Sequence, residues 1–392
     1  MKVDNRRIPQ LDGLRVVAII LIFLSHMDFV YTGDISYPYG EFFRVYLRNS
    51  DLGVDYFFML SGFGLYLASL RKEPVKPSLK NCFTFAWRKI RKFYPFYLAS
   101  MLMMIPFQPG FITDGRFHAS ALRPLIIRLP FMLTLTQSLV GVKSFSRQLN
   151  SVSWFLSTLF LLYMVTPVLL PFLKKKAGSL RKTVRLLSLT LAGLFVASFA
   201  FLYIHRFGLF GKKTTFDLFY GSPYIRVFYL AVGMEIGMLY SFLSERLKFS
   251  AAAEWAVSVT ALLYYLGRNL IPDVPLLPAM IIRVCDVTVC MLVLGVFALG
   301  KGRVSSFLAR GAGASEYITY IFLFHYPLRF YVDKLFTSFG IYFGDLTGIA
   351  EILVIFGLTL LLSAACVRLQ RLTRSRRIPD QTPSGSSPGT SG

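Results

Sequence analysis

Apolar runs about 20 residues long alternate with short polar segments along almost the whole chain. A run of this length, when it forms an α-helix, matches the thickness of the hydrocarbon core of a bilayer. About ten such runs use up the chain and leave no stretch for a separate soluble domain. The pattern therefore predicts an all-α fold, a polytopic membrane protein with about ten transmembrane helices.

The limits of the apolar runs set the predicted helices. The segment 122–140 is apolar but carries Arg123, Arg128 and Pro130, so we expect it to re-enter the membrane or to lie at its interface. Residues 379–392 contain mostly Ser, Gly, Pro and Thr, which predicts a disordered polar tail after a membrane domain of residues 1–378. The ten helices are expected at about 11–31, at 52–70, from the basic residues 88–92 toward Pro109, and at 153–173, 184–204, 224–242, 254–270, 280–299, 316–336 and 348–368.

Charge adds an orientation to this picture. The chain has 43 Lys and Arg against 20 Asp and Glu, a net charge of +23. In a membrane protein such an excess marks cytoplasmic loops, so it does not call for a nucleic acid partner. The cytoplasmic loops hold the larger share of Lys and Arg if 122–140 does not span. We therefore expect both the N- and the C-terminus to be cytoplasmic.

The cysteines give no sign of a metal site or of disulfides. Cys82, Cys285, Cys290 and Cys366 are scattered, and none forms a set with ligand spacing. The chain also shows no internal repeat of fixed period and no inverted pair of broken helices, the pattern of many transporters. The sequence thus predicts no bound metal and no permanently bound cofactor.

Ionisable residues in the first helix are the first candidates for chemistry, because charge inside a membrane is costly and usually functional. Arg15 and His26 are eleven residues apart, which places them on nearly one face of a helix and about 16 Å apart along it. Asp12 lies one turn before Arg15 and is expected to form an ion pair with it. Alternatively, Arg15 only extends to the lipid headgroups.

His26 is a candidate general base at the outer end of this helix. Asp55 enters the second helix from the same side of the membrane, so the two side chains could meet. A histidine oriented by a carboxylate can take a proton from a sugar hydroxyl. The alternative is an interfacial histidine bonded to a backbone carbonyl.

A second candidate site lies on the cytoplasmic side, where Arg88 and Arg91 are three residues apart and so share one helix face. Two guanidinium groups there could bind the phosphates of an acyl-coenzyme A. The alternative is a topology signal or a site for anionic lipids.

Other polar residues within the apolar runs are weaker candidates. Ser61 could donate a hydrogen bond at the middle of the membrane, and His325 is a second imidazole near the bilayer centre that must have a polar partner. Arg283 and Asp286, three apart, are expected to form an internal ion pair. Glu235 is an acid in a membrane helix to which the sequence assigns no role.

Five motifs along the chain resemble, in their order, those of acyltransferase family 3, the integral-membrane acyltransferases that include bacterial O-acetyltransferases of surface polysaccharides. The resemblance covers nearly the whole chain. The motifs are Leu11-Asp12-Gly13-Leu14-Arg15 with His26; Gly53-Val54-Asp55, Phe57-Phe58 and Ser61-Gly62; Arg88, Arg91 and Tyr94-Pro95; Arg226-Val227-Phe228-Tyr229 with Gly233; and Ser315 through Tyr320 to His325 and Pro327.

The resemblance implies that Arg15 and His26 are essential and that Arg88 and Arg91 bind the acyl-coenzyme A donor, with acetyl-coenzyme A as the expected form. It implies transfer of an acyl group to a hydroxyl of an extracytoplasmic carbohydrate, in a bacterial inner or plasma membrane. The expected partners are a carbohydrate acceptor and membrane lipids. The sequence leaves the acceptor, the acyl group and the oligomeric state open.

One departure from the family pattern lies in the helix at 153–173. Many relatives have Trp-Ser-Leu-Ser-Val-Glu there, whereas this chain has Trp154 to Leu159 without the acid.

The rival function is a lipid-linked glycan transporter or flippase, which also needs polar groups along an internal path. The absence of repeats and the cytoplasmic arginine pair argue against it.

Overall fold

The computed structural model describes residues 7–27, 42, 45–47, 51–108, 112–113, 116–117, 122–207, 218, 220–270, 276–341 and 345–375. The predicted tail at 379–392 and the predicted end of the first helix lie outside these residues. The regular structure of the described residues is helical apart from two short strands, β1 (Ile112–Thr113) and β2 (Arg116–Phe117), which pair antiparallel. The helices are α1 (Pro9–Ser25), α4 (Asp51–Ser69), α5 (Leu79–Ile90), α6 (Tyr94–Leu102), α7 (Leu122–Leu133), α8 (Lys143–Ser146), α9 (Trp154–Lys176), α10 (Leu180–Phe207), α12 (Pro223–Leu243), α13 (Ala251–Leu270), α14 (Leu276–Leu299), α15 (Arg303–Arg310), α16 (Ile318–Ser338) and α17 (Asp345–Ser375), with 3-10 turns η1 (Ile105–Phe107), η3 (Gln137–Leu139), η4 (Ser151–Ser153) and η5 (Gly311–Glu316).

Six of the described helices are long and apolar enough to cross a membrane: α4, α9 with η4, α10, α12, α14 and α17. This confirms a helical, multi-pass membrane protein. The predicted number of ten spans and the cytoplasmic position of both termini remain predictions. α1 is described over 17 residues only, and α16 carries Arg329, Asp333 and Lys334 within its 21 residues, so neither is among the six.

The third predicted helix is wrong in its limits. Instead of one helix that begins near residues 88–92, α5 ends at Ile90 and α6 begins at Tyr94 after a turn. Pro95 lies in the first turn of α6, where its missing N–H group costs nothing, but it could not continue the hydrogen-bond ladder of α5. The result is two short helices, α5 with one polar face and α6 of nine residues.

The segment 122–140 forms α7, a helix of 12 residues that contains Pro130. At 1.5 Å per residue it is about 18 Å long, shorter than the hydrocarbon core of about 30 Å. A turn with η3 follows it. This geometry agrees with the expectation that the segment does not span.

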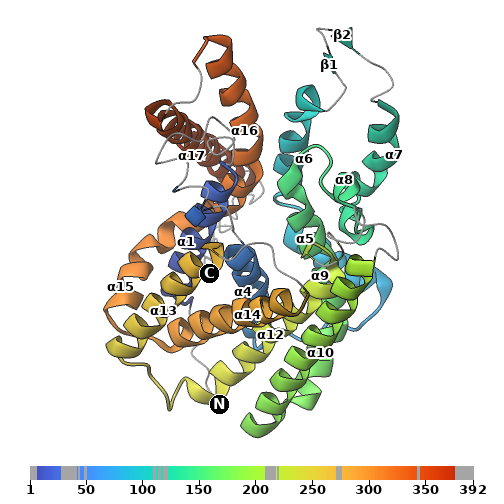
Figure 1. Cartoon of the computed structure of the whole chain (residues 1–392). Helices are drawn as coiled ribbons and strands as arrows, with labels where there is room; N and C mark the ends of the chain where they lie inside the picture. The colour runs from blue at the N-terminus through green and yellow to red at the C-terminus, as the bar shows by residue number, and fades with distance from the viewer. Residues whose placement is uncertain are drawn as a thin grey trace, which may run out of the picture.

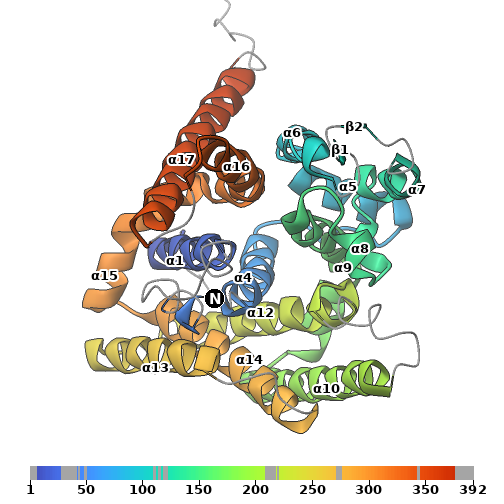
Figure 2. The same ribbon diagram turned by 45° about the horizontal axis from the view of Figure 1, so that its top comes forward.

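The central helix α4 packs most extensively against α12, with α1 and α14 on its other sides. Figures 1 and 2 both place α4 between α1 and the group of α5 to α9, whereas α16 and α17 stand together beside the far end of α1. α4 and α12 come unusually close because a Cβ atom at Gly233 would lie 1.8 Å from the carbonyl oxygen of Met59, and one at Gly62 would lie 2.0 Å from that of Leu230. Small residues thus let the two backbones touch.

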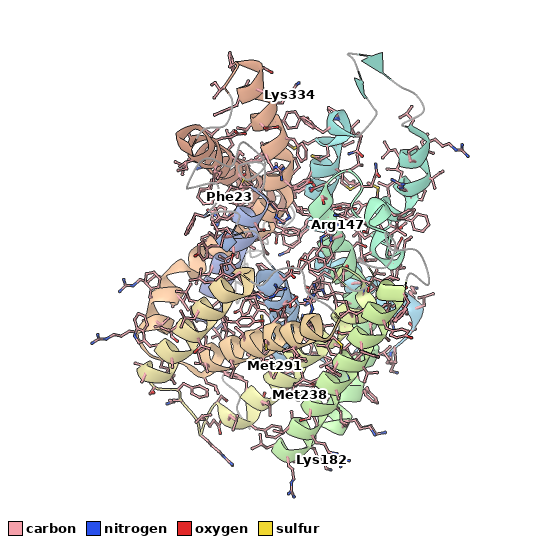
Figure 3. The ribbon with its side chains drawn as sticks, in the orientation of Figure 1. Phe23, Arg147, Lys182, Met238, Met291 and Lys334 are labelled. Atoms are coloured by element: carbon pink, nitrogen blue, oxygen red, sulfur yellow. The ribbon has the colours of Figure 1, made fainter. Side chains whose placement is uncertain are left out.

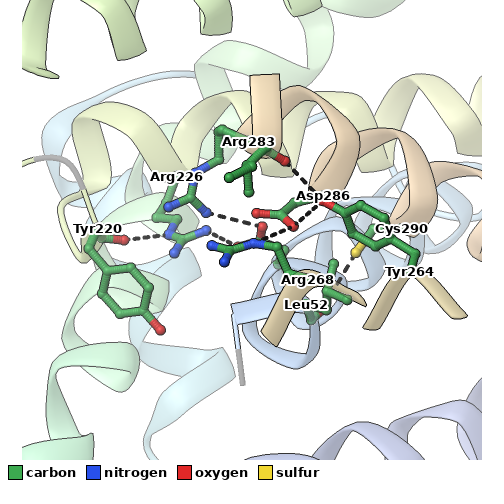
Figure 4. A network of polar contacts seen from close by, with 10 residues as sticks. Leu52, Tyr220, Arg226, Tyr264, Arg268, Arg283, Asp286 and Cys290 are labelled. Carbon is green, nitrogen blue, oxygen red and sulfur yellow. Dashed lines mark hydrogen bonds and ion pairs between the residues drawn. The ribbon is translucent and has the colours of Figure 1, made fainter. Parts of the chain in front are cut away.

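Buried charges join α4 to α12 and α14 (Figure 4). Asp55 of α4 is completely buried and accepts from the guanidinium group of Arg226, which is 1% exposed. Nη1 of Arg283 lies 3.4 Å from the other Asp55 oxygen. Asp286, the expected partner of Arg283, accepts a hydrogen bond of 2.8 Å from Tyr264. Three helices are therefore held by one carboxylate.

We predict that Asp55→Asn lowers the stability of the folded protein. Removal of one member of a buried ion pair typically costs about 3 to 5 kcal/mol, because the remaining charges stay buried without compensation. The measurement is the thermal unfolding midpoint of purified protein in detergent. Glu316→Gln, which breaks the exposed pair between Glu316 and Arg371, is the control and should change the midpoint little. An unchanged midpoint for Asp55→Asn would contradict a stabilising role of this pair.

The topology prediction can be tested at the end of α9. If α7 does not span, a reporter enzyme fused after Lys176 should read as cytoplasmic, because the last turn of α9 then places the basic cluster of Lys174 to Lys176 on that side of the membrane. A second fusion after residue 207, at the end of α10, should read as extracytoplasmic. The opposite pair of results would refute the predicted orientation.

Candidate functional site

A cavity of about 190 Å³ lies between α1, α4, α5, α9 and the start of α16. The first and second helices contribute Arg15 and Ser61, two residues that the sequence had singled out separately. Most of the wall is apolar, and most polar groups come from different helices. The polar lining residues are Arg15, Ser61, Lys89, Tyr163, Ser315 and Thr319. An apolar pocket with a few converging polar groups is the usual form of a ligand site.

Asp12 holds Arg15 in place at this cavity. Nη1 of Arg15 donates to Asp12 Oδ1 over 2.7 Å, which confirms the predicted ion pair. The other Asp12 oxygen accepts from Nε of Arg7, and Nη2 of Arg7 donates to Ser315 Oγ over 2.7 Å. The Asp12 side chain is 8% exposed and that of Arg15 is 39% exposed. One carboxylate thus orients the guanidinium group that lines the cavity.

The side of the cavity formed by α9 was missed by the sequence analysis. Ser61 Oγ donates to the carbonyl oxygen of Phe57 over 2.8 Å and is also hydrogen-bonded to the side chain of Tyr163. Phe155, Leu159 and Tyr163 all line the cavity and are spaced four residues apart. This helical spacing, beside the position where the family acid is absent, is the signal that could have identified Tyr163.

The basic run at the end of α5 presents a different residue from the expected one. Lys89 is half-buried and lines the cavity, whereas Arg88 and Arg91 are exposed on either side of it along the chain. α5 lies outside the candidate membrane spans. Burial of the Lys89 ammonium group, together with the nearby charge of Lys72, lowers the pKa of Lys89. The two arginines are therefore exposed on the surface of the protein, and the lysine between them faces the cavity.

His26 caps the C-terminal end of α1, beyond the described cavity. Its Nδ1 lies 2.8 Å from the carbonyl oxygen of Ile22, one turn earlier. Since a carbonyl oxygen only accepts, Nδ1 carries the proton and Nε2 carries the lone pair of the neutral ring. The backbone contact that sequence analysis offered as an alternative is therefore present, and it leaves the tautomer that a general base at Nε2 requires.

The partner expected for His26 is wrong. Asp55 is held by Arg226 and Arg283 in the buried network, so it does not orient the imidazole. The ring next to His26 is His325, with centroids 5.1 Å apart. Figure 3 shows the neighbouring Phe23 where α1 meets α16, and the Phe23 ring lies 6.0 Å from that of His325. The buried arginines need the carboxylate as a counter-charge, which explains its position.

The cavity and the two histidines are neighbours along α16. Phe322 lines the cavity, and its ring lies 6.2 Å from that of His325. Arg15 and His26 are about 16 Å apart along α1. The described arrangement thus consists of an inner cavity at Arg15 and a histidine pair further along, with one aromatic ring between them.

Two further groups are placed by the structure. Glu235, the acid without a role, is buried in α12 and accepts a hydrogen bond of 2.7 Å from Thr190 of α10. All four cysteines are free. Within the described ranges, no cluster of three or more His, Cys, Asp or Glu side chains could hold a metal ion.

Comparison with known families covers most of the chain. A family model described as an acyltransferase domain matches residues 8–368. No curated protein and no solved structure matches the chain. The match includes α1 with Arg15 and His26 and every helix that lines the cavity. By this match over nearly its whole length, the chain belongs to acyltransferase family 3.

Proposed function

We propose that this protein is an O-acyltransferase that moves an acyl group, acetyl in the simplest case, from cytoplasmic acyl-coenzyme A to a hydroxyl group of an extracytoplasmic carbohydrate. The observation that carries the proposal is the cavity that contains Arg15 and Lys89, with His26 further along the same helix as Arg15. Family membership supports acyl transfer. The proposal adds the donor, the acceptor and a bacterial inner or plasma membrane to this family membership.

The donor would be bound in two parts. Its phosphates would lie at the exposed Arg88 and Arg91, which can form charge-assisted hydrogen bonds with them. Its narrow pantetheine arm would enter the cavity, where Arg15 and Lys89 can donate to its amide carbonyls. Asp12 serves this step by keeping the Arg15 side chain in position.

Transfer would take place beyond the cavity, near His26. Nε2 of His26 takes the proton of the acceptor hydroxyl, and the hydroxyl oxygen attacks the acyl carbon of the thioester. The carbon–sulfur bond then breaks, and the proton passes to the leaving thiolate, which gives the ester and free coenzyme A. A base at this end of α1 suits an acceptor that approaches from outside.

The experiment that tests the proposal is acyl transfer by the purified protein in lipid vesicles. Labelled acetyl-coenzyme A is supplied with a panel of polysaccharides and lipid-linked glycans, and labelled ester and free thiol are measured. Equal amounts of the two products support the proposal. Movement of lipid-linked glycans without thiol release would favour the rival transporter.

For the donor site, we predict that Arg88→Ala with Arg91→Ala weakens binding of acyl-coenzyme A at least tenfold. Each guanidinium would lose a contact to a charged group, worth about 1.5 to 3 kcal/mol. The measurement is donor affinity by equilibrium binding. Lys80→Ala, an exposed cation earlier on α5, is the control and should bind normally. Normal binding by the double variant would leave the arginines as a topology signal.

For the base, we predict that His26→Ala and His26→Gln lower turnover about 10²- to 10⁴-fold, the usual contribution of a positioned base. Donor affinity should stay unchanged, because neither variant touches the cavity. Turnover is measured per folded molecule. Ser25→Ala is the matched control, since Ser25 Oγ also donates to the carbonyl of Ile22, over 2.8 Å. Near-normal turnover of His26→Gln would rule out the base.

A further inference from the structure

A second and larger cavity, of about 600 Å³, lies where α1 begins and where α12 and α14 end. Because α12 and α14 are candidate membrane spans, their ends place this cavity at the level of the lipid headgroups, on the side predicted to be cytoplasmic. α15 forms another wall and packs against α1 (Figures 1 and 2). The cavity has the size of a ligand site, and no described residue lines both it and the cavity at Arg15.

Cationic side chains from three segments of the chain line this second cavity: Arg7, Lys248 and Lys301. All three residues are exposed. Within the described ranges, neither lysine side chain forms a hydrogen bond or an ion pair. Glu245 is the acid among the described lining residues, so positive charge predominates. Basic pockets of this kind at the cytoplasmic ends of membrane helices are typical sites for phosphate groups.

Other polar groups of the lining are already used by the fold. Nε2 of Gln10 donates to the carbonyl oxygens of Phe297 and Gly300, over 3.0 Å and 3.2 Å. Ser305 Oγ donates to Glu254 over 2.7 Å, and the same carboxylate accepts from the backbone N–H group of Ser305 over 3.0 Å. The N-terminal end of α15 therefore already has an anion bound to it. The cations are the groups that are left for a ligand.

Arg7 lines the second cavity and also supports the cavity at Arg15. Its Nε donates to Asp12, which holds Arg15, and its Nη2 donates to Ser315, which lines the cavity at Arg15. Among the described residues Nη1 has no hydrogen-bond partner, so it is the nitrogen of Arg7 that is available to a ligand. The Arg7 side chain is 65% exposed. A ligand bound at Nη1 would therefore restrict the motion of this side chain.

We propose that the second cavity binds a phosphate group through Arg7, Lys248 and Lys301, and that this binding strengthens donor binding in the cavity at Arg15. The link between the cavities rests on the proposed function, in which the cavity at Arg15 takes the donor; the phosphate site itself does not. A phosphate group accepts several charge-assisted hydrogen bonds at once, which suits three cations. With Nη1 bound, Arg7 stays in contact with Asp12, so Arg15 is held in position before the donor arrives.

The first test measures phosphate binding by the full-length protein in detergent, because a lipid headgroup and a soluble compound carry the same chemistry. Retention of phosphatidylglycerol, with phosphatidylcholine as reference, is followed by native mass spectrometry, and affinity for inorganic phosphate is measured by calorimetry. In Lys248→Ala with Lys301→Ala we expect at least a tenfold loss of affinity, since two contacts to a charged group are removed. A loss for the lipid identifies a headgroup ligand, and a loss for inorganic phosphate identifies a soluble one.

The control for the first test is Arg181→Ala with Lys182→Ala, two exposed cations at the start of α10, where Figure 3 labels Lys182. This variant removes the same charge on the same predicted side and should bind normally. Three results would overturn the phosphate site: no binding of either probe by the wild-type protein, unchanged binding of both probes in the lysine variant, or an equal loss in the control.

The second test measures equilibrium binding of acetyl-coenzyme A with phosphatidylglycerol, with inorganic phosphate and with neither. The probe bound in the first test should raise the donor affinity of the wild-type protein about fivefold or more, a typical coupling between two sites. The rise should be absent in Lys248→Ala with Lys301→Ala. It should also be absent in Arg7→Lys, which keeps a cation but lacks the fork that reaches Asp12 and Ser315 together. Donor binding without any rise in the wild-type protein, or an equal rise in the lysine variant, would overturn the link. A wild-type protein that binds no acetyl-coenzyme A would instead refute the proposed function, and the first test would still decide the phosphate site.

Discussion

The buried carboxylate of Asp55 is the constraint on which the arrangement of the central helices depends. Two arginines, one each from α12 and α14, lie within the bundle and cannot remain there without a counter-charge. Because Asp55 belongs to α4, its position fixes that helix against both neighbours. The close backbone contact between Gly233 of α12 and Met59 of α4 also fixes α4 against α12, through steric fit. Ser61 lies on the same helix as Asp55. The contacts of Asp55 and Gly233 that fix α4 therefore also fix the part of the cavity wall that contains Ser61.

Local patterns in the sequence predicted local structure well. The apolar run at 224–242 became α12 (Pro223–Leu243), because a continuous apolar stretch of this length has few other stable forms in a membrane. The ion pair of Asp12 and Arg15 was predictable because residues three apart on a helix are neighbours. The third helix failed because its apolar content continued across Pro95, where the backbone had to break.

Contacts between distant parts of the chain were not predictable from spacing. Asp55 lies 171 positions before Arg226 and 228 before Arg283, and no periodicity of one helix shows which partner it meets. The expected approach to His26 rested only on a shared side of the membrane. The same limit applies to Tyr163 and Lys89, whose helical faces point to the cavity only after α5 and α9 have packed. Arg15 and Ser61 were identified because charge and polarity are unusual within apolar runs.

α1 carries groups at both ends of the candidate path. Asp12 fixes the direction of the Arg15 side chain through their ion pair. The helical backbone of α1 sets the distance from Arg15 to His26, because a helix is a rigid element. Arg329 ties the C-terminal end of α1 to α16 through the backbone oxygen of His26. α16 in turn contributes Phe322 to the cavity wall and His325 to the histidine pair. A ligand in the cavity that displaced Phe322 would therefore change the packing of the His325 ring, because the Phe322 ring lies against both.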